Sequence, residues 1–88
     1  MEKVVFYKVY KFEDTRTGEK FYFENKDSAE MARFSVYSRY DGERISTRNF
    51  VVPVTKVKPV LILESELDKF IVRKGFQEYN TELAEIEK

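Results

Sequence analysis

The chain has 88 residues, enough for one small domain. Its composition of 42% hydrophobic and 36% charged residues, with three Gly and two Pro, excludes collagen and low-complexity disorder. The longest uncharged run, residues 49–55, is too short to cross a bilayer. Cys and His are both absent, so the sequence lacks thiol chemistry, disulfides, the commonest metal ligand and the commonest general base. We therefore expect no enzyme activity, no metal and no cofactor.

The formal net charge is zero, but the charges are unevenly distributed. Residues 25–63 hold seven basic and four acidic residues, whereas residues 64–88 hold four basic and seven acidic residues. This asymmetry bears on the partners of the protein and not on its fold.

The first predicted element is a β-hairpin, because residues 4–12 and 20–24 are rich in β-branched and aromatic residues. The turn-forming residues 14–18 separate them, and Gly18 can adopt a left-handed conformation there. A register with Asp14 opposite Glu19 places aromatic pairs on one face and an opposite-charge pair on the other. The pairs are Phe12 with Phe21, Tyr10 with Phe23, and Glu13 with Lys20.

A helix is predicted next, with Asn25 as its N-cap and Asp41-Gly42 as its end. Its apolar stripe is formed by Ala29, Ala32, Val36 and Tyr40. The small alanines let this helix lie close to the sheet.

The second half of the chain predicts one long strand over about residues 45–57 and a short apolar segment over 60–63. Because proline cannot donate to a sheet ladder, Pro53 and Pro59 indicate either an edge strand or two strands separated near Pro59. Two short helices follow, one from Ser65 to a stop at Gly75 and one over residues 80–87. The predicted fold class is α+β, a small antiparallel sheet packed with one central helix and two short C-terminal helices.

The face of the hairpin opposite the predicted core is the first candidate binding surface. It carries apolar, aromatic and basic side chains, which are Tyr7, Val9, Lys11, Lys20 and Tyr22. Either the C-terminal helices cover this face through Leu67, Phe70 and Ile71, or it binds a partner or a second copy of the chain.

Two charged surfaces are further candidates. An acidic stripe would lie on one face of the C-terminal helix and consists of Glu78, Glu82 and Glu85. A basic region with interleaved aromatic residues suits nucleic acid, and consists of Arg33, Arg39, Arg44, Arg48, Lys56 and Lys58. The zero net charge argues against the nucleic-acid interpretation.

Residues 21–32 (FYFENKDSAEMA) resemble the strand, cap and helix of small proteins encoded by phages and mobile elements, some anti-CRISPR proteins among them. The resemblance implies a non-catalytic, cytoplasmic protein that binds a larger nucleic-acid enzyme, such as a CRISPR nuclease, and blocks its function. Two alternatives stay open, a small nucleic-acid-binding module that uses residues 33–58 and a homodimeric structural or assembly protein.

Overall fold

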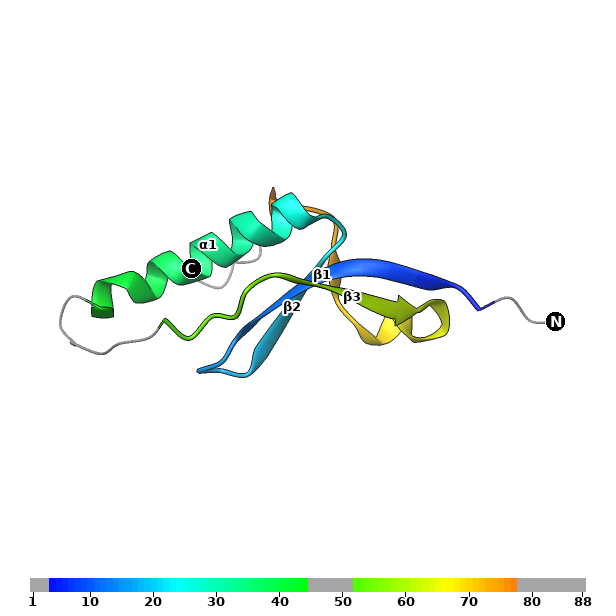
Figure 1. Ribbon diagram of the computed structural model, residues 1–88, viewed down its shortest axis with the longest axis horizontal. Coiled ribbons are helices and arrows are strands. Elements are labelled where there is room, and N and C mark those ends of the chain that lie inside the picture. Colours follow the sequence, from blue (N-terminus) through cyan, green and yellow to red (C-terminus); the bar gives the residue numbers. More distant parts are fainter. Residues whose placement is uncertain (1–3, 45–51, 78–88) are drawn as a thin grey trace.

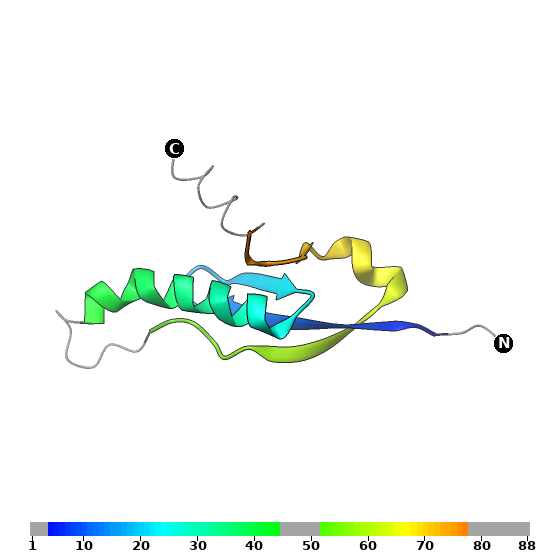
Figure 2. The same ribbon diagram turned by 90° about the horizontal axis from the view of Figure 1, so that it is seen from above.

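The computed structural model describes residues 4–44 and 52–77, which form a small α+β domain with a four-stranded mixed sheet (Figure 1). The strand order is β3-β1-β2-β4. Helix α1 lies over one face of the sheet, and a short 3-10 helix, η1, lies on the other side (Figures 1 and 2). The bounds are β1 Phe6–Asp14, β2 Glu19–Phe23, α1 Lys26–Arg44, β3 Lys58–Leu63, η1 Glu64–Lys69 and β4 Val72–Arg73.

The predicted hairpin is confirmed, together with its register. Asp14 lies opposite Glu19 and Phe12 lies opposite Phe21. Gly18 has φ of 79°, a conformation that favours glycine over every other residue. The aromatic pairing and the turn therefore agree on one register.

The start of α1 is also confirmed, because Asn25 Oδ1 accepts a hydrogen bond of 2.8 Å from the backbone N–H of Ser28. The predicted end is wrong, since α1 continues through Gly42 to Arg44. A glycine inside a helix costs only about 1 kcal/mol relative to alanine. The packing of the apolar stripe against the sheet outweighs that cost.

The predicted strand over residues 45–57 is wrong in its described part, because the regular strand begins at Lys58. A hydrogen bond of 2.8 Å from Val54 N–H to the Val52 carbonyl bends the chain at Pro53. Residues 52–57 still follow the end of β1, with Thr55 N–H donating to the Glu13 carbonyl. Residues 45–51 lie outside the described part of the chain. Of the two interpretations of the prolines, the edge strand is confirmed for Pro59, since Pro59 lies within β3 and β3 is an edge strand of the described sheet, beside β1.

The C-terminal part differs most from the prediction, because the expected helix from Ser65 to Gly75 is a 3-10 helix followed by a strand. Segment η1 carries the chain across the sheet, so β4 pairs with β2 in parallel and the sheet is mixed. The Glu24 N–H donates to the Arg73 carbonyl and continues this pairing. The predicted last helix, residues 80–87, lies outside the described residues.

The main core lies between α1 and the sheet. Its fully or nearly fully buried members are Phe12, Phe21, Phe23, Ala29, Ala32 and Val36. The Phe12 ring stacks on Phe21 with a centroid distance of 4.8 Å. Val9 and Ile62 are buried as well, and the strand register places both on the face opposite α1. The sheet is therefore packed on both faces.

Candidate protein-interaction surfaces

The described part of the chain was first searched for a metal site and for a membrane-spanning helix. In residues 4–44 and 52–77, no three or more Asp and Glu side chains gather in a group that could hold a metal ion. No helix in this part of the chain is both long enough and apolar enough to span a membrane. The candidate sites named from the sequence are surfaces, and each is described below by which of its side chains are exposed.

The outer face of the hairpin is partly covered. Val9 is only 2% exposed, so it is not available to a partner. The prediction that Val9 is a surface residue is wrong, and Val9 belongs to the core. Tyr22 makes an edge-to-face ring contact with Phe70 at 5.1 Å. Tyr7 lies beside Leu67 and Phe70 but keeps 43% of its surface exposed.

The cover comes from the C-terminal segment, as one of the two sequence interpretations expected, although by a 3-10 helix and a strand. Ile71 takes no part in it, since its side chain is 69% exposed. The charged residues of the same face, Lys11 and Lys20, remain half-buried and exposed respectively. What is left of the predicted surface is a narrow strip with Tyr7 at one end and the two lysines at the other.

At the basic end of this strip, lysines from the neighbouring residues 56–58 lie beside Lys11. Lys11 of β1 lies directly opposite Lys58 of β3, and Lys56 lines the same shallow hollow. Like charges directly opposite in a sheet are mutually destabilising. Lys20 lies on the other side of β1, opposite Glu13.

The predicted basic region is divided between the two faces of the sheet. On the α1 side, Arg33 Nε donates a hydrogen bond of 2.7 Å to the Thr55 carbonyl, and its guanidinium lies 5.9 Å from the centre of the Tyr37 ring. Lys58 lies on the opposite face. The Arg44 side chain and all of Arg48 lie outside the description, as does the predicted acidic stripe, Glu78, Glu82 and Glu85. The described basic residues do not form one continuous groove.

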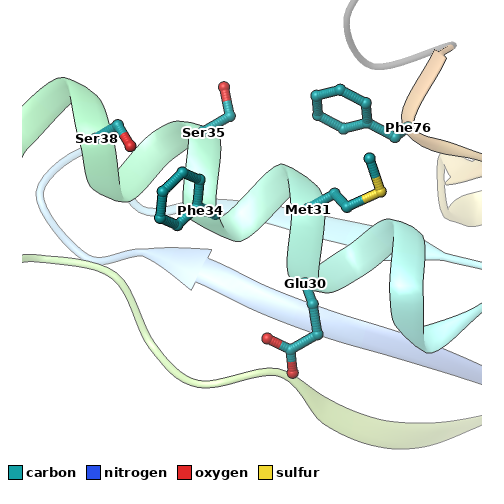
Figure 3. Close-up of a pocket in the computed structure, with 6 residues that line it drawn as sticks. All are labelled: Glu30, Met31, Phe34, Ser35, Ser38 and Phe76. Carbon is teal, nitrogen blue, oxygen red and sulfur yellow. The ribbon is translucent and has the colours of Figure 1, made fainter.

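A surface that the sequence analysis missed lies on the solvent side of α1. Met31 is 53% exposed and Phe34 is 68% exposed, although both are large and apolar. Together with Phe76, which follows β4, they form an apolar groove, shown in Figure 3. The figure shows Met31 directed toward Phe76, with Phe34 one turn further along the helix. Ser35, Ser38 and Glu30 complete the lining, and Figure 3 shows the Glu30 carboxylate directed away from Phe76. The sequence could have indicated that Met31 and Phe34 are exposed, because their helical positions lie outside the apolar stripe of Ala29, Ala32, Val36 and Tyr40.

A polar cluster at the end of β1, in which Asp14 is buried, Tyr40 partly buried and Arg16 exposed, joins the hairpin to α1. Tyr40 Oη donates a hydrogen bond of 2.6 Å to Asp14 Oδ2, and the Arg16 guanidinium lies 4.6 Å from the centre of the Tyr40 ring. The hydrogen bond to Asp14 raises the pKa of Tyr40, and burial and the negative charge of Asp14 act in the same direction. Arg16 and Arg39 partly oppose this effect. The cluster fixes the position of α1 over the sheet.

This raised pKa predicts a loss of stability in alkali. Below the ordinary tyrosine pKa, about 10, Tyr40 is protonated in the folded and unfolded chains alike. As the pH rises further, the unfolded chain loses the proton first, so the free energy of unfolding falls as the pH rises through the folded pKa. Urea unfolding between about pH 8 and about pH 11 should show a shallower fall for Tyr40→Phe than for the native chain. If the free energy of unfolding falls with pH equally steeply in both chains, Tyr40 does not cause the loss of stability in alkali.

Comparison of the chain with protein-family models, with curated proteins and with solved structures found no match.

Proposed function

We propose that this protein is a non-catalytic protein-binding module whose contact surface is centred on the apolar groove of α1. The observation that carries the proposal is the exposure of Phe34, at 68%, on a helix whose opposite side is fully buried. An isolated exposed apolar residue needs no explanation, but a phenylalanine and a methionine beside a third apolar side chain in a groove are typical of an interaction site.

The charges beside the groove indicate the chemistry of the partner. Asp27 and Glu30 are exposed, and their spacing to Met31 and Phe34 places all four on one side of the helix. A matching partner offers an apolar anchor with Lys or Arg beside it. Enzymes that handle nucleic acid carry basic surfaces of this kind, since they must bind phosphates.

We therefore infer that the partner is a larger nucleic-acid-processing enzyme, such as a CRISPR nuclease, whose function the bound protein blocks. The resemblance of residues 21–32 to proteins of phages and mobile elements supports the same partner class. Direct binding of nucleic acid by this chain is less well supported, because Arg33 and Lys58 lie on different faces of the sheet.

Phe34→Ala should weaken binding of the partner by roughly 30-fold, which is the effect of losing a hot-spot aromatic of about 2 kcal/mol. The stability of the domain should change little, because Phe34 is mostly solvated already. Ile71→Ala is the matched control, since Ile71 is equally exposed and does not line the groove.

The measurement is affinity capture from a bacterial lysate, with and without nuclease treatment. The captured protein is then titrated against the native chain, the Phe34→Ala variant and the Ile71→Ala variant. The proposal is supported if one protein is captured even after nuclease treatment, and if its binding is lost with Phe34→Ala and kept with Ile71→Ala. Addition of the native chain should then inhibit the captured enzyme on its nucleic-acid substrate. Nuclease-sensitive capture, or equal losses with the two variants, contradicts it.

A further inference from the structure

The outer edge of β3 has a regular pattern of open backbone groups. The sheet order leaves β3 with β1 on one side and no other described strand on its far side. Glu64 N–H donates to the Val5 carbonyl at 2.9 Å, and these two residues continue the β1–β3 register. Backbone groups alternate in direction along a strand, so those of Lys58, Val60, Ile62 and Glu64 point toward β1. Those of Pro59, Leu61 and Leu63 then point outward.

The position of Pro59 agrees with this alternation. Proline has no N–H to donate, and here the missing donor is on the outer side, where the β1–β3 ladder does not need it. The remaining outward groups are the N–H groups of Leu61 and Leu63 and the carbonyls of Pro59 and Leu61, because Leu63 is the N-cap of η1 and its carbonyl accepts the first hydrogen bond of that helix. These groups can form a second ladder with an antiparallel strand.

The sequence of β3 and its next residue is self-complementary in one antiparallel register. With Leu61 opposite Leu61 of a second copy, each Leu61 N–H meets the other's carbonyl, and each Leu63 N–H meets the carbonyl of Pro59 in the second copy. The same register places Lys58 opposite Glu64 of the second copy, twice by symmetry. Both side chains are exposed in the single chain.

The other outward residues make poorer centres of symmetry. Centring on Pro59 sets two prolines opposite each other and forms no hydrogen bond between them. Centring on Leu63 sets Glu64 opposite the apolar Ile62 and extends the pairing into η1. Of the three registers centred on an outward residue, the Leu61 register alone satisfies both the charges and the hydrogen bonds.

The apolar side chains around this edge also need a cover. Leu61 is 64% exposed and Phe6 is 53% exposed, on the face that carries α1 further along the sheet. Both views show that this end of β1 and β3 extends beyond the first turn of α1 (Figures 1 and 2). A second copy would bring two Leu61 side chains together there and remove both from water.

We propose that the protein forms a homodimer by antiparallel pairing of two β3 strands, with Leu61 on the two-fold axis and the sheet continuous across both copies. The opposite charges of Lys58 and Glu64 select a second copy of this chain over an unrelated strand. This interface lies at the β3 edge, whereas the α1 groove adjoins the segment that follows β4 at the other edge of the sheet. The homodimer through β3 and the partner-binding groove of α1 can therefore be tested independently of each other.

Charge reversal tests the register. Lys58→Glu sets like charges opposite each other at both ends of the interface, and Glu64→Lys does the same with the opposite sign. Each single variant should weaken the dimer by about tenfold in sedimentation velocity over a range of protein concentrations. The double variant, Lys58→Glu with Glu64→Lys, should restore the native dissociation constant. Glu66→Lys is the control, since Glu66 pairs with Lys69 on η1 at 2.8 Å and lies off the edge.

Backbone pairing is tested by Leu61→Pro, which removes an outward N–H for which residues 4–44 and 52–77 of the single chain provide no acceptor. It should abolish the dimer and leave the far-UV circular dichroism of the domain unchanged. If that variant unfolds, the charge-reversal set still decides the matter. A native chain that stays monomeric at every concentration overturns the proposal, as does a double variant that dimerises no better than either single one.

Discussion

Replacing Phe12 with alanine is expected to lower the free energy of unfolding by about 3–5 kcal/mol. Phe12 has no exposed surface and lies between the rings of Phe21 and Phe23, at centroid distances of 4.8 Å and 6.1 Å. The truncation removes the stacked ring and leaves a cavity that the neighbouring strands of a hydrogen-bonded sheet cannot close. Domains of this size have little stability in reserve, so the variant is expected to be partly unfolded at room temperature.

Tyr7→Ala is the comparison for this prediction, measured by the same urea or thermal unfolding. Tyr7 lies on the opposite face of β1 and is 43% exposed, so its truncation should cost clearly less than that of Phe12. Equal losses would mean that the outer face, covered by Leu67 and Phe70, contributes as much to stability as the layer under α1.

Asp14→Ala is expected to cost about 3 kcal/mol, because a carboxylate that accepts several hydrogen bonds is removed from an almost fully buried position. Asp14 is 7% exposed and accepts hydrogen bonds from the backbone N–H of Arg16 at 3.0 Å, from that of Thr17 at 3.3 Å, and from Tyr40 at 2.6 Å. Alanine leaves these donors without their partner, at the place where the hairpin turn, α1 and residues 52–57 meet.

The matched variants separate these contributions. Tyr40→Phe removes only the hydrogen bond to α1 and should cost less than Asp14→Ala. Asp14→Asn keeps one acceptor oxygen for the turn and should fall between the two, as measured by urea unfolding at neutral pH. An alanine variant as stable as Tyr40→Phe would show that the turn hydrogen bonds contribute nothing.

The first half of the fold was predictable because local signals agree with one another there. The register of β1 with β2 is set by aromatic pairs, a charge pair and a glycine that must adopt positive φ. The N-cap at Asn25 and the alanine stripe set the start and the buried side of α1. The end of α1 was missed because a glycine is a permissive signal, and the packing of the rest of the helix decides whether it ends there.

The second half was mispredicted because its structure depends on the sheet already formed. The residues of β4, Val72 and Arg73, form a strand because the edge of β2 offers backbone groups to pair with. The Arg73 guanidinium lies 5.4 Å from the centre of the Phe21 ring, a contact that no local sequence pattern indicates. The sequence indicated Met31 and Phe34 as exposed apolar residues of α1, but it did not indicate Phe76, which lines the same groove only after β4 has docked.

The position of the main core in the sequence has a consequence for how the chain folds. All of its buried members lie between Phe12 and Val36, in one hairpin and the helix that directly follows it. Contacts this close in sequence form rapidly, since little loop entropy is lost in bringing them together. During synthesis the hairpin and α1 can assemble before β3 has left the ribosome. The later strands then add to an existing template, β3 against β1 and β4 against β2, and the order of synthesis becomes the order of assembly.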